Sequence, residues 1–106
     1  MLERVYRAAD GVEVHLSLEQ WVNHILDGHP ELQISDLETA ILRPERICQD
    51  INKPLHRVYE SATNTTGFLR RNSHSVVIIN MWNDQVGDVI TVYLSGLYYK
   101  GVQLWP

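Results

Sequence analysis

The chain has 106 residues, of which 44% are hydrophobic, and a formal net charge of −4. This length predicts a single domain, residues 1–106, with one modest core. The acidic balance argues against binding of nucleic acid over the whole surface, because neutralising phosphates requires clustered lysines and arginines. A local basic cleft remains compatible with it.

The chain also lacks the signals of a membrane or secreted protein. Its longest apolar run, 75–82, is far shorter than the about 20 residues that a transmembrane helix needs. The N-terminus has no apolar region typical of a signal peptide. Cys48 is the only cysteine, so an internal disulfide is excluded. We therefore expect a cytoplasmic protein without a membrane partner, with Cys48 buried in a short strand.

The segment 5–17 predicts a half-buried strand. A turn pair, Asp10-Gly11, precedes apolar residues that alternate with polar ones: Val12, Val14 and Leu16. Such alternation is typical of a strand with one face in the core and the other in solvent. We expect a hairpin around the turn, or a strand that follows an extended arm.

Two capping boxes predict two consecutive helices. In the first, Ser17 and Gln20 satisfy the amides that begin a helix over 18–28, and glycine and proline follow its last turn. In the second, Ser35 and Glu38 open a shorter helix that ends before the next proline. Apolar residues recur at spacings of three and four along the first helix, which therefore packs one face on the core.

The rest of the chain predicts an antiparallel meander. Strand-like segments alternate with turn-rich linkers, and the segments are 46–50, 55–61, 66–71, 75–82 and 88–94. The apolar run 76–79 indicates a central strand. We therefore expect an α+β fold in which two helices from the N-terminal half pack on one face of an antiparallel sheet of about four strands. The other face would form a shallow site.

Two histidines lie around the end of the first predicted helix. Imidazole titrates near neutrality, so His24 and His29 are candidate proton donors and acceptors. Their spacing of five, with Gly28 between them, does not match a zinc-binding helix, and no cysteine cluster accompanies them. We expect no metal and no other cofactor. In the plainer interpretation, His29 caps the helix carbonyls and His24 packs beside Trp21.

Polar side chains on two predicted strands complete the candidate site. The strand period of two puts Arg57 and Tyr59 on one side of their strand, and Thr91 and Tyr93 on one side of theirs. On a shared face these residues would form a phosphate-binding patch, because the arginine fork fits phosphate oxygens. The plainer alternative is a solvated sheet face made of good strand formers.

The ordered motifs resemble the phage-associated nuclease-like domains of the barnase, EndoU, colicin and RelE superfamily. The resemblance covers about 17–94 and rests on the helix end 21–32 with His24 and His29, then 43–47, Asp50, the motif Arg57-x-Tyr59 and the strand 89–94. It implies a metal-independent ribonuclease of two helices and a four-stranded antiparallel sheet, acting as a toxin or as a phage or mobile-element nuclease.

The resemblance also implies roles for these residues in cleavage of RNA by its 2′-hydroxyl. His24 or His29 would transfer protons. Arg57 would stabilise the charge on the phosphate, and Thr91 or Tyr93 would donate a hydrogen bond to it. Tyr59 is carried over with Arg57 as a matching site residue. RNA would be the substrate, and a cognate antitoxin or immunity protein would be a natural partner.

The acidity fits a second class of function, a small cytoplasmic binding protein. An immunity protein or antitoxin that covers a basic nuclease would gain association rate from its opposite charge. Exposed aromatic and acidic side chains would anchor such a partner. The apolar C-terminal segment 97–106 would pack on the core or form a self-association surface.

Overall fold

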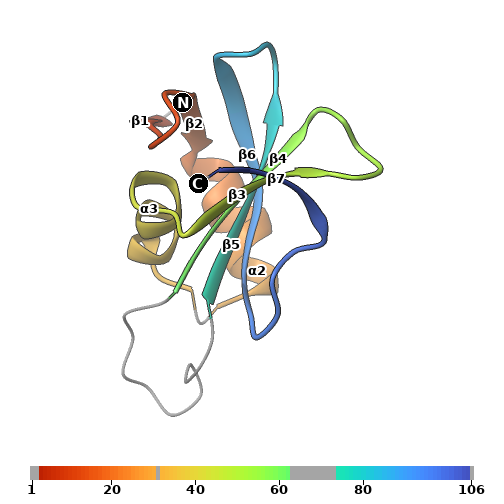
Figure 1. Cartoon of the computed structure of the whole chain (residues 1–106). Coiled ribbons are helices and arrows are strands. Elements are labelled where there is room, and N and C mark those ends of the chain that lie inside the picture. The colour runs from red at the N-terminus through yellow and green to blue at the C-terminus, as the bar shows by residue number, and fades with distance from the viewer. Residues whose placement is uncertain (1–2, 31, 63–73, 106) are drawn as a thin grey trace.

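A computed structural model describes residues 3–30, 32–62 and 74–105 of the chain (Figure 1). Within them, seven strands form one sheet in the order β1-β2-β6-β5-β4-β3-β7. The strands are β1 (Glu3–Arg7), β2 (Glu13–Ser17), β3 (Arg46–Asp50), β4 (His56–Ala62), β5 (His74–Met81), β6 (Val86–Ser95) and β7 (Gly101–Trp105). The predicted strand 66–71 lies outside the described residues.

The expected four-stranded antiparallel sheet is wrong, because the described residues build a larger, mixed sheet. The predicted hairpin does form, from β1 and β2, but β2 also pairs in parallel with β6 and thereby adds the hairpin to the sheet. At the other edge, β7 pairs with β3. Both additions join segments far apart in the chain, and their own residue patterns do not reveal such partners.

The helices begin and end close to where the capping signals place them. The first helical segment runs without a break through α1 (Leu18–Gln20), the π-helical turn η1 (Trp21–Ile25) and α2 (Leu26–Gly28). The Ser17 hydroxyl caps it, but the Gln20 side chain donates to the carbonyl of Ile90 on β6, at 2.7 Å, instead of reaching back to the cap. No helix in the described residues is long and apolar enough to cross a membrane.

The second helix, α3 (Ile34–Leu42), begins two residues earlier than the predicted box implies. Its N-cap is Gln33, whose backbone N–H donates to the carboxylate of Asp36 at 2.8 Å. The predicted pair was Ser35 and Glu38. The buried carboxylate of Asp36 therefore replaces Glu38 as the group that closes the box.

Both helices cover the same face of the sheet, which we call the helix-covered face. Its core contains Trp21 and Ile25 from the first helical segment, Ile41 from α3, and Val77 and Ile79 from β5. Residues that lie opposite each other on neighbouring strands point to the same face of the sheet. The strand registers therefore define which residues lie on the opposite face, which we call the open face. The open face carries Arg46, Cys48 and Asp50 of β3, His56, Val58 and Glu60 of β4, His74, Val76 and Ile78 of β5, and Thr91 and Tyr93 of β6.

An irregularity in the pairing of β5 with β6 changes which side chains reach the core. The register shifts between Ile78 and Ile79. Val89 is consequently buried in the core under the helices, although strict alternation predicts it beside Thr91 and Tyr93. Thr91 and Tyr93 themselves remain together on the open face. Cys48 is fully buried, as expected.

The chain crosses the open face between β6 and β7 (Figure 1). We call residues 96–100 the covering segment. It passes over β5 and β4 to reach the edge of β3, and from Ser95 to Gly101 it can span at most about 20 Å even when extended. A Cβ atom at Gly101 would lie 2.5 Å from the carbonyl oxygen of Gln49, so glycine is needed where β7 meets β3.

Adjacent residues near the end of α3 test how this helix is oriented. Ile41 is fully buried, whereas Leu42 is 46% exposed. Ile41→Ala should lower the free energy of unfolding by about 2–5 kcal/mol through loss of contacts and a residual cavity. Leu42→Ala should change it by less than about 1 kcal/mol. Urea denaturation measures both, and equal losses would contradict the orientation.

Candidate active site on the open face of the sheet

The six side chains predicted to act together do not form one site. Arg57 and Tyr59 lie on the helix-covered face, whereas Thr91 and Tyr93 lie on the open face. The expected shared face is therefore wrong. The physical reason is the strand register, which pairs Tyr59 with the core residue Val77.

Arg57 and Tyr59 instead bind one carboxylate in the β1–β2 turn. The buried Tyr59 hydroxyl donates to Asp10 Oδ1 at 2.8 Å, and Arg57 Nη1 forms an ion pair with Asp10 Oδ2 at 3.1 Å. Burial and the charge of Asp10 raise the pKa of Tyr59 far above its ordinary value. Gly11 completes the turn at a φ of 90°. These contacts fasten β4 to the hairpin.

The two predicted histidines also separate. His24 is exposed and lines a hollow of about 360 Å³ together with His15 and Asp88. His29 follows α2, and its ring centroid lies 6.3 Å from that of Tyr93. Of the pair, His29 thus approaches the polar residues of the open face.

A buried carboxyl group occupies the middle of the open face. Glu60 is fully buried, and its Oε1 accepts the backbone N–H of Tyr99 at 2.6 Å. Its Oε2 lies 3.7 Å from Arg46 Nη1 and accepts no hydrogen bond from the described residues. Burial raises the pKa of Glu60, although Tyr99, Arg46 and His74 act in the opposite direction. The net effect is a pKa of Glu60 above its ordinary value, with burial as the largest cause.

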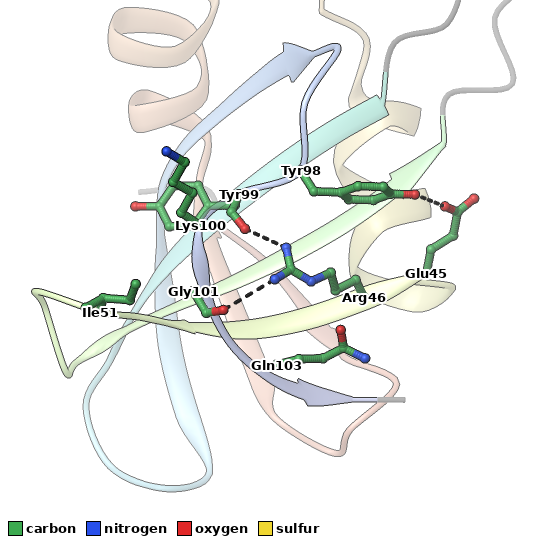
Figure 2. Close-up of a pocket in the computed structure, with 8 residues that line it drawn as sticks. All are labelled: Glu45, Arg46, Ile51, Tyr98, Tyr99, Lys100, Gly101 and Gln103. Carbon is green, nitrogen blue, oxygen red and sulfur yellow. Dashed lines mark hydrogen bonds between the residues drawn. The ribbon is translucent and has the colours of Figure 1, made fainter.

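Arg46 connects this carboxyl group to the covering segment. Figure 2 shows its guanidinium group pointing at the backbone, where Nη1 donates to the Tyr99 carbonyl at 2.5 Å and Nη2 to the Gly101 carbonyl at 3.3 Å. The ring of Tyr98 lies 5.9 Å from the guanidinium carbon, and its hydroxyl donates to Glu45 at 3.1 Å. Arg46 thus orders the segment and places positive charge next to Glu60.

His74 lies on the other side of the carboxyl group. It is buried, and its ring stacks on Tyr98 with 4.7 Å between centroids. Its Nε2 atom has no hydrogen-bond partner among the described residues, which exclude the neighbouring segment 63–73. An imidazole and a carboxyl group of raised pKa can exchange protons with a bound substrate. We call Arg46, Glu60 and His74 the open-face triad.

A groove of about 720 Å³ lies beside Arg46 of the triad (Figure 2). It is lined by Glu45, Arg46, Ile51, Tyr98, Tyr99, Lys100, Gly101 and Gln103. The Tyr99 hydroxyl donates to Asp50, a bond that raises the pKa of Tyr99 to about 12 and lowers that of Asp50. Exposed tyrosine rings with nearby cations are groups that bind nucleobases and phosphates.

Sequence reasoning missed the open-face triad. The strand period places Glu60 on the same side as Val58, and a carboxylate beside an apolar strand residue is a recognisable signal. Arg46 and His74 belong to different strands, and only the registers of β3 and β5 with β4 bring them to Glu60. No pattern within a single strand predicts that Arg46 and His74 lie beside Glu60. Among the described residues, no group of three or more His, Cys, Asp or Glu side chains is arranged to hold a metal ion.

Tyr59→Phe tests the structural role of the contact with Asp10. Loss of a buried hydrogen bond to a charged group should lower the free energy of unfolding by about 1.5–3 kcal/mol. Tyr98→Phe is the matched control, because its hydroxyl bonds an exposed carboxylate, and it should cost less than about 1 kcal/mol. Chemical denaturation compares the two, and a larger loss from Tyr98→Phe would contradict the structural assignment.

Glu60→Gln tests the raised pKa of Glu60. A carboxyl group whose pKa is higher in the folded state than in the unfolded state takes up a proton on folding, so its contribution to stability decreases as pH rises. The stability of the natural protein relative to Glu60→Gln should therefore fall as pH rises from about the ordinary value of 4.5. Denaturation across pH 4–8 measures the difference, and a rise with pH would show that Arg46 dominates.

No family model matches the chain, and no curated protein and no solved structure matches it either. The resemblance to the barnase, EndoU, colicin and RelE superfamily accordingly remains a prediction from the ordered motifs.

Proposed function

We propose that the chain is a metal-independent endoribonuclease whose site is the open-face triad. The observation that carries the proposal is the buried Glu60 carboxyl group, with its raised pKa, between Arg46 and His74. Cleavage of RNA by its 2′-hydroxyl needs a proton acceptor, a proton donor and a cation for the charge that develops on phosphorus oxygens. These three side chains supply the three groups.

Each group of the triad has a defined part in the reaction. Glu60 accepts the proton of the 2′-hydroxyl as the 2′-oxygen bonds to phosphorus, and a raised pKa makes this carboxylate a stronger base. The bond from phosphorus to the 5′-oxygen breaks, and protonated His74 donates a proton to that oxygen. Arg46 stabilises the charged transition state. The products are a 2′,3′-cyclic phosphate and a 5′-hydroxyl.

Other side chains on this face are suited to hold RNA. Tyr93 and Tyr98 offer rings for stacking of bases, and Lys100 offers a cation beside the groove. Thr91 supplies a hydroxyl donor, and His29 lies beside Tyr93. A role as a toxin or as a phage or mobile-element nuclease, a cognate antitoxin or immunity protein, and a cytoplasmic location stay predictions from the sequence.

A second candidate function, binding of a basic protein, is favoured by a cluster at the opposite end of the sheet. His15 lies between Glu3 and Glu13, with 2.7 Å from Nε2 to Glu13. Its ring is tilted by 31° against that of Trp82, with 5.3 Å between the centroids. Trp82 is 57% exposed, and its indole donates to Asp88 at 2.5 Å. An exposed tryptophan among carboxylates is a typical anchor for a positively charged partner.

Cleavage of RNA in excess EDTA tests the first function. The purified protein should convert total RNA or an oligoribonucleotide into fragments that end in 2′,3′-cyclic phosphates, and an all-2′-deoxy substrate should remain intact. Glu60→Gln and His74→Gln should each lower kcat/KM at least about 100-fold, because each removes a proton-transfer group. His56→Gln, a change on the same face but outside the triad, should keep the natural rate.

The opposite results would separate the two functions. Natural activity in Glu60→Gln would remove the triad from the reaction. No cleavage of any RNA, together with salt-sensitive capture of a basic nuclease that Trp82→Ala abolishes, would favour the binding function.

A further inference from the structure

The groups of the proposed site are all engaged by one short piece of chain. The covering segment donates the Tyr99 N–H to Glu60, offers the Tyr99 carbonyl to Arg46, and places the Tyr98 ring on His74. Gly101, the next residue, offers a second carbonyl to Arg46. Glu60 is fully buried beneath these contacts. In this arrangement, RNA cannot reach the carboxyl group.

The segment is held by polar contacts more than by burial. Leu97 is 80% exposed and Tyr98 is 56% exposed, and neither belongs to the core under the helices. Tyr99 packs against the smaller buried cluster of Cys48, Val58 and Val76. Local openings require the least free energy where buried apolar contacts are few. Lifting the segment should therefore leave the rest of the sheet intact.

The contacts of Arg46 indicate what would replace the segment. Its guanidinium group binds two neutral carbonyl oxygens, from Tyr99 and Gly101, in a forked arrangement (Figure 2). A phosphate group offers two charged oxygens to the same fork, and such a two-bond arginine–phosphate pair adds the attraction of opposite charges to the hydrogen bonds. A phosphate in this position would also lie beside Glu60 and His74, where the proposed reaction needs it.

We propose that residues 96–100 form a lid, which closes the site in the unliganded protein. An RNA phosphate displaces this lid by binding Arg46 in place of the backbone carbonyls. This regulation rests on the proposed ribonuclease function, because it names the event that opens the same site.

Two glycines at the ends of the lid provide a matched pair of variants. A Cβ atom at Gly101 would lie 2.5 Å from the backbone oxygen of Gln49 and 3.0 Å from the sulfur of Cys48, so Gly101→Ala should push this end of the lid away from β3. A Cβ atom at Gly96 would meet nothing within 4 Å, so Gly96→Ala is the control.

Exchange of the Tyr99 amide hydrogen reports whether the lid is closed, because this N–H binds Glu60. The probe is a 2′-O-methyl oligoribonucleotide, which carries phosphates but lacks the nucleophilic hydroxyl. Binding of this probe to the natural protein should accelerate Tyr99 exchange by about tenfold and leave the Val58 amide in β4 unchanged. Unchanged or slower Tyr99 exchange at a saturating concentration of the probe would overturn the lid.

Gly101→Ala should accelerate Tyr99 exchange without the probe, and it should raise the rate of RNA cleavage at low substrate concentration about threefold or more, because more molecules are open. Gly96→Ala should do neither. Slower cleavage in a folded Gly101→Ala protein would overturn the lid. Should Gly101→Ala fail to fold, the exchange experiment on the natural protein decides.

The two proposals fail in different ways. Cleavage of RNA together with unchanged Tyr99 exchange on probe binding would overturn the lid and leave the ribonuclease function standing. Faster Tyr99 exchange on probe binding, without cleavage of any RNA, would support the lid and overturn the ribonuclease function.

Discussion

The burial of the Glu60 carboxyl group is the constraint on which the open face of this protein depends. A carboxyl group without water must find hydrogen-bond donors, a counter-charge or a proton. Here the donor is the Tyr99 N–H, the counter-charge is Arg46 at 3.7 Å, and burial raises the pKa. The donor comes from the segment that leads to β7. The last strand and the last connection of the described chain are therefore tied to one side chain in the middle of the sheet.

The two faces of the sheet have different physical roles. On the helix-covered face, apolar side chains fill the core, and the contact of Tyr59 with Asp10 fixes the hairpin to the central strands. On the open face, polar groups meet the covering segment, and the buried apolar cluster of Cys48, Val58 and Val76, on which Tyr99 packs, is smaller than the core under the helices. Stability is thus concentrated on one side, and the side with less burial can rearrange when a ligand binds.

Arg46 links the chemistry of the open face to its accessibility. The same guanidinium group neutralises the region around Glu60 and holds the backbone of the covering segment. Under the proposed function, a phosphate that competes for Arg46 would change both the charge and the closure of the site. The acidic net charge is compatible with this arrangement, because phosphate recognition there depends on a few placed donors, and the charge of the whole chain matters less.

Local signals in the sequence determined where most elements begin and end. The Ser17 cap, the Gly28 stop and the Asp10-Gly11 turn all lie where the residues predict them, because capping and turn formation depend on side chains within a few residues. Alternation also placed Thr91 and Tyr93 together.

Only the tertiary structure decided which faces meet and which strands pair. Alternation alone does not determine which side of β4 faces the helices. The predicted shared face of Arg57 and Tyr59 with Thr91 and Tyr93 is wrong for this reason. The irregularity opposite Ile78 and the pairing of β7 with β3 are likewise set by distant strands. The triad itself joins three strands through their registers. A sequence pattern with period two fixes a residue's side of its own strand, whereas a site on a sheet is made by register between strands, which forms only when the whole sheet assembles.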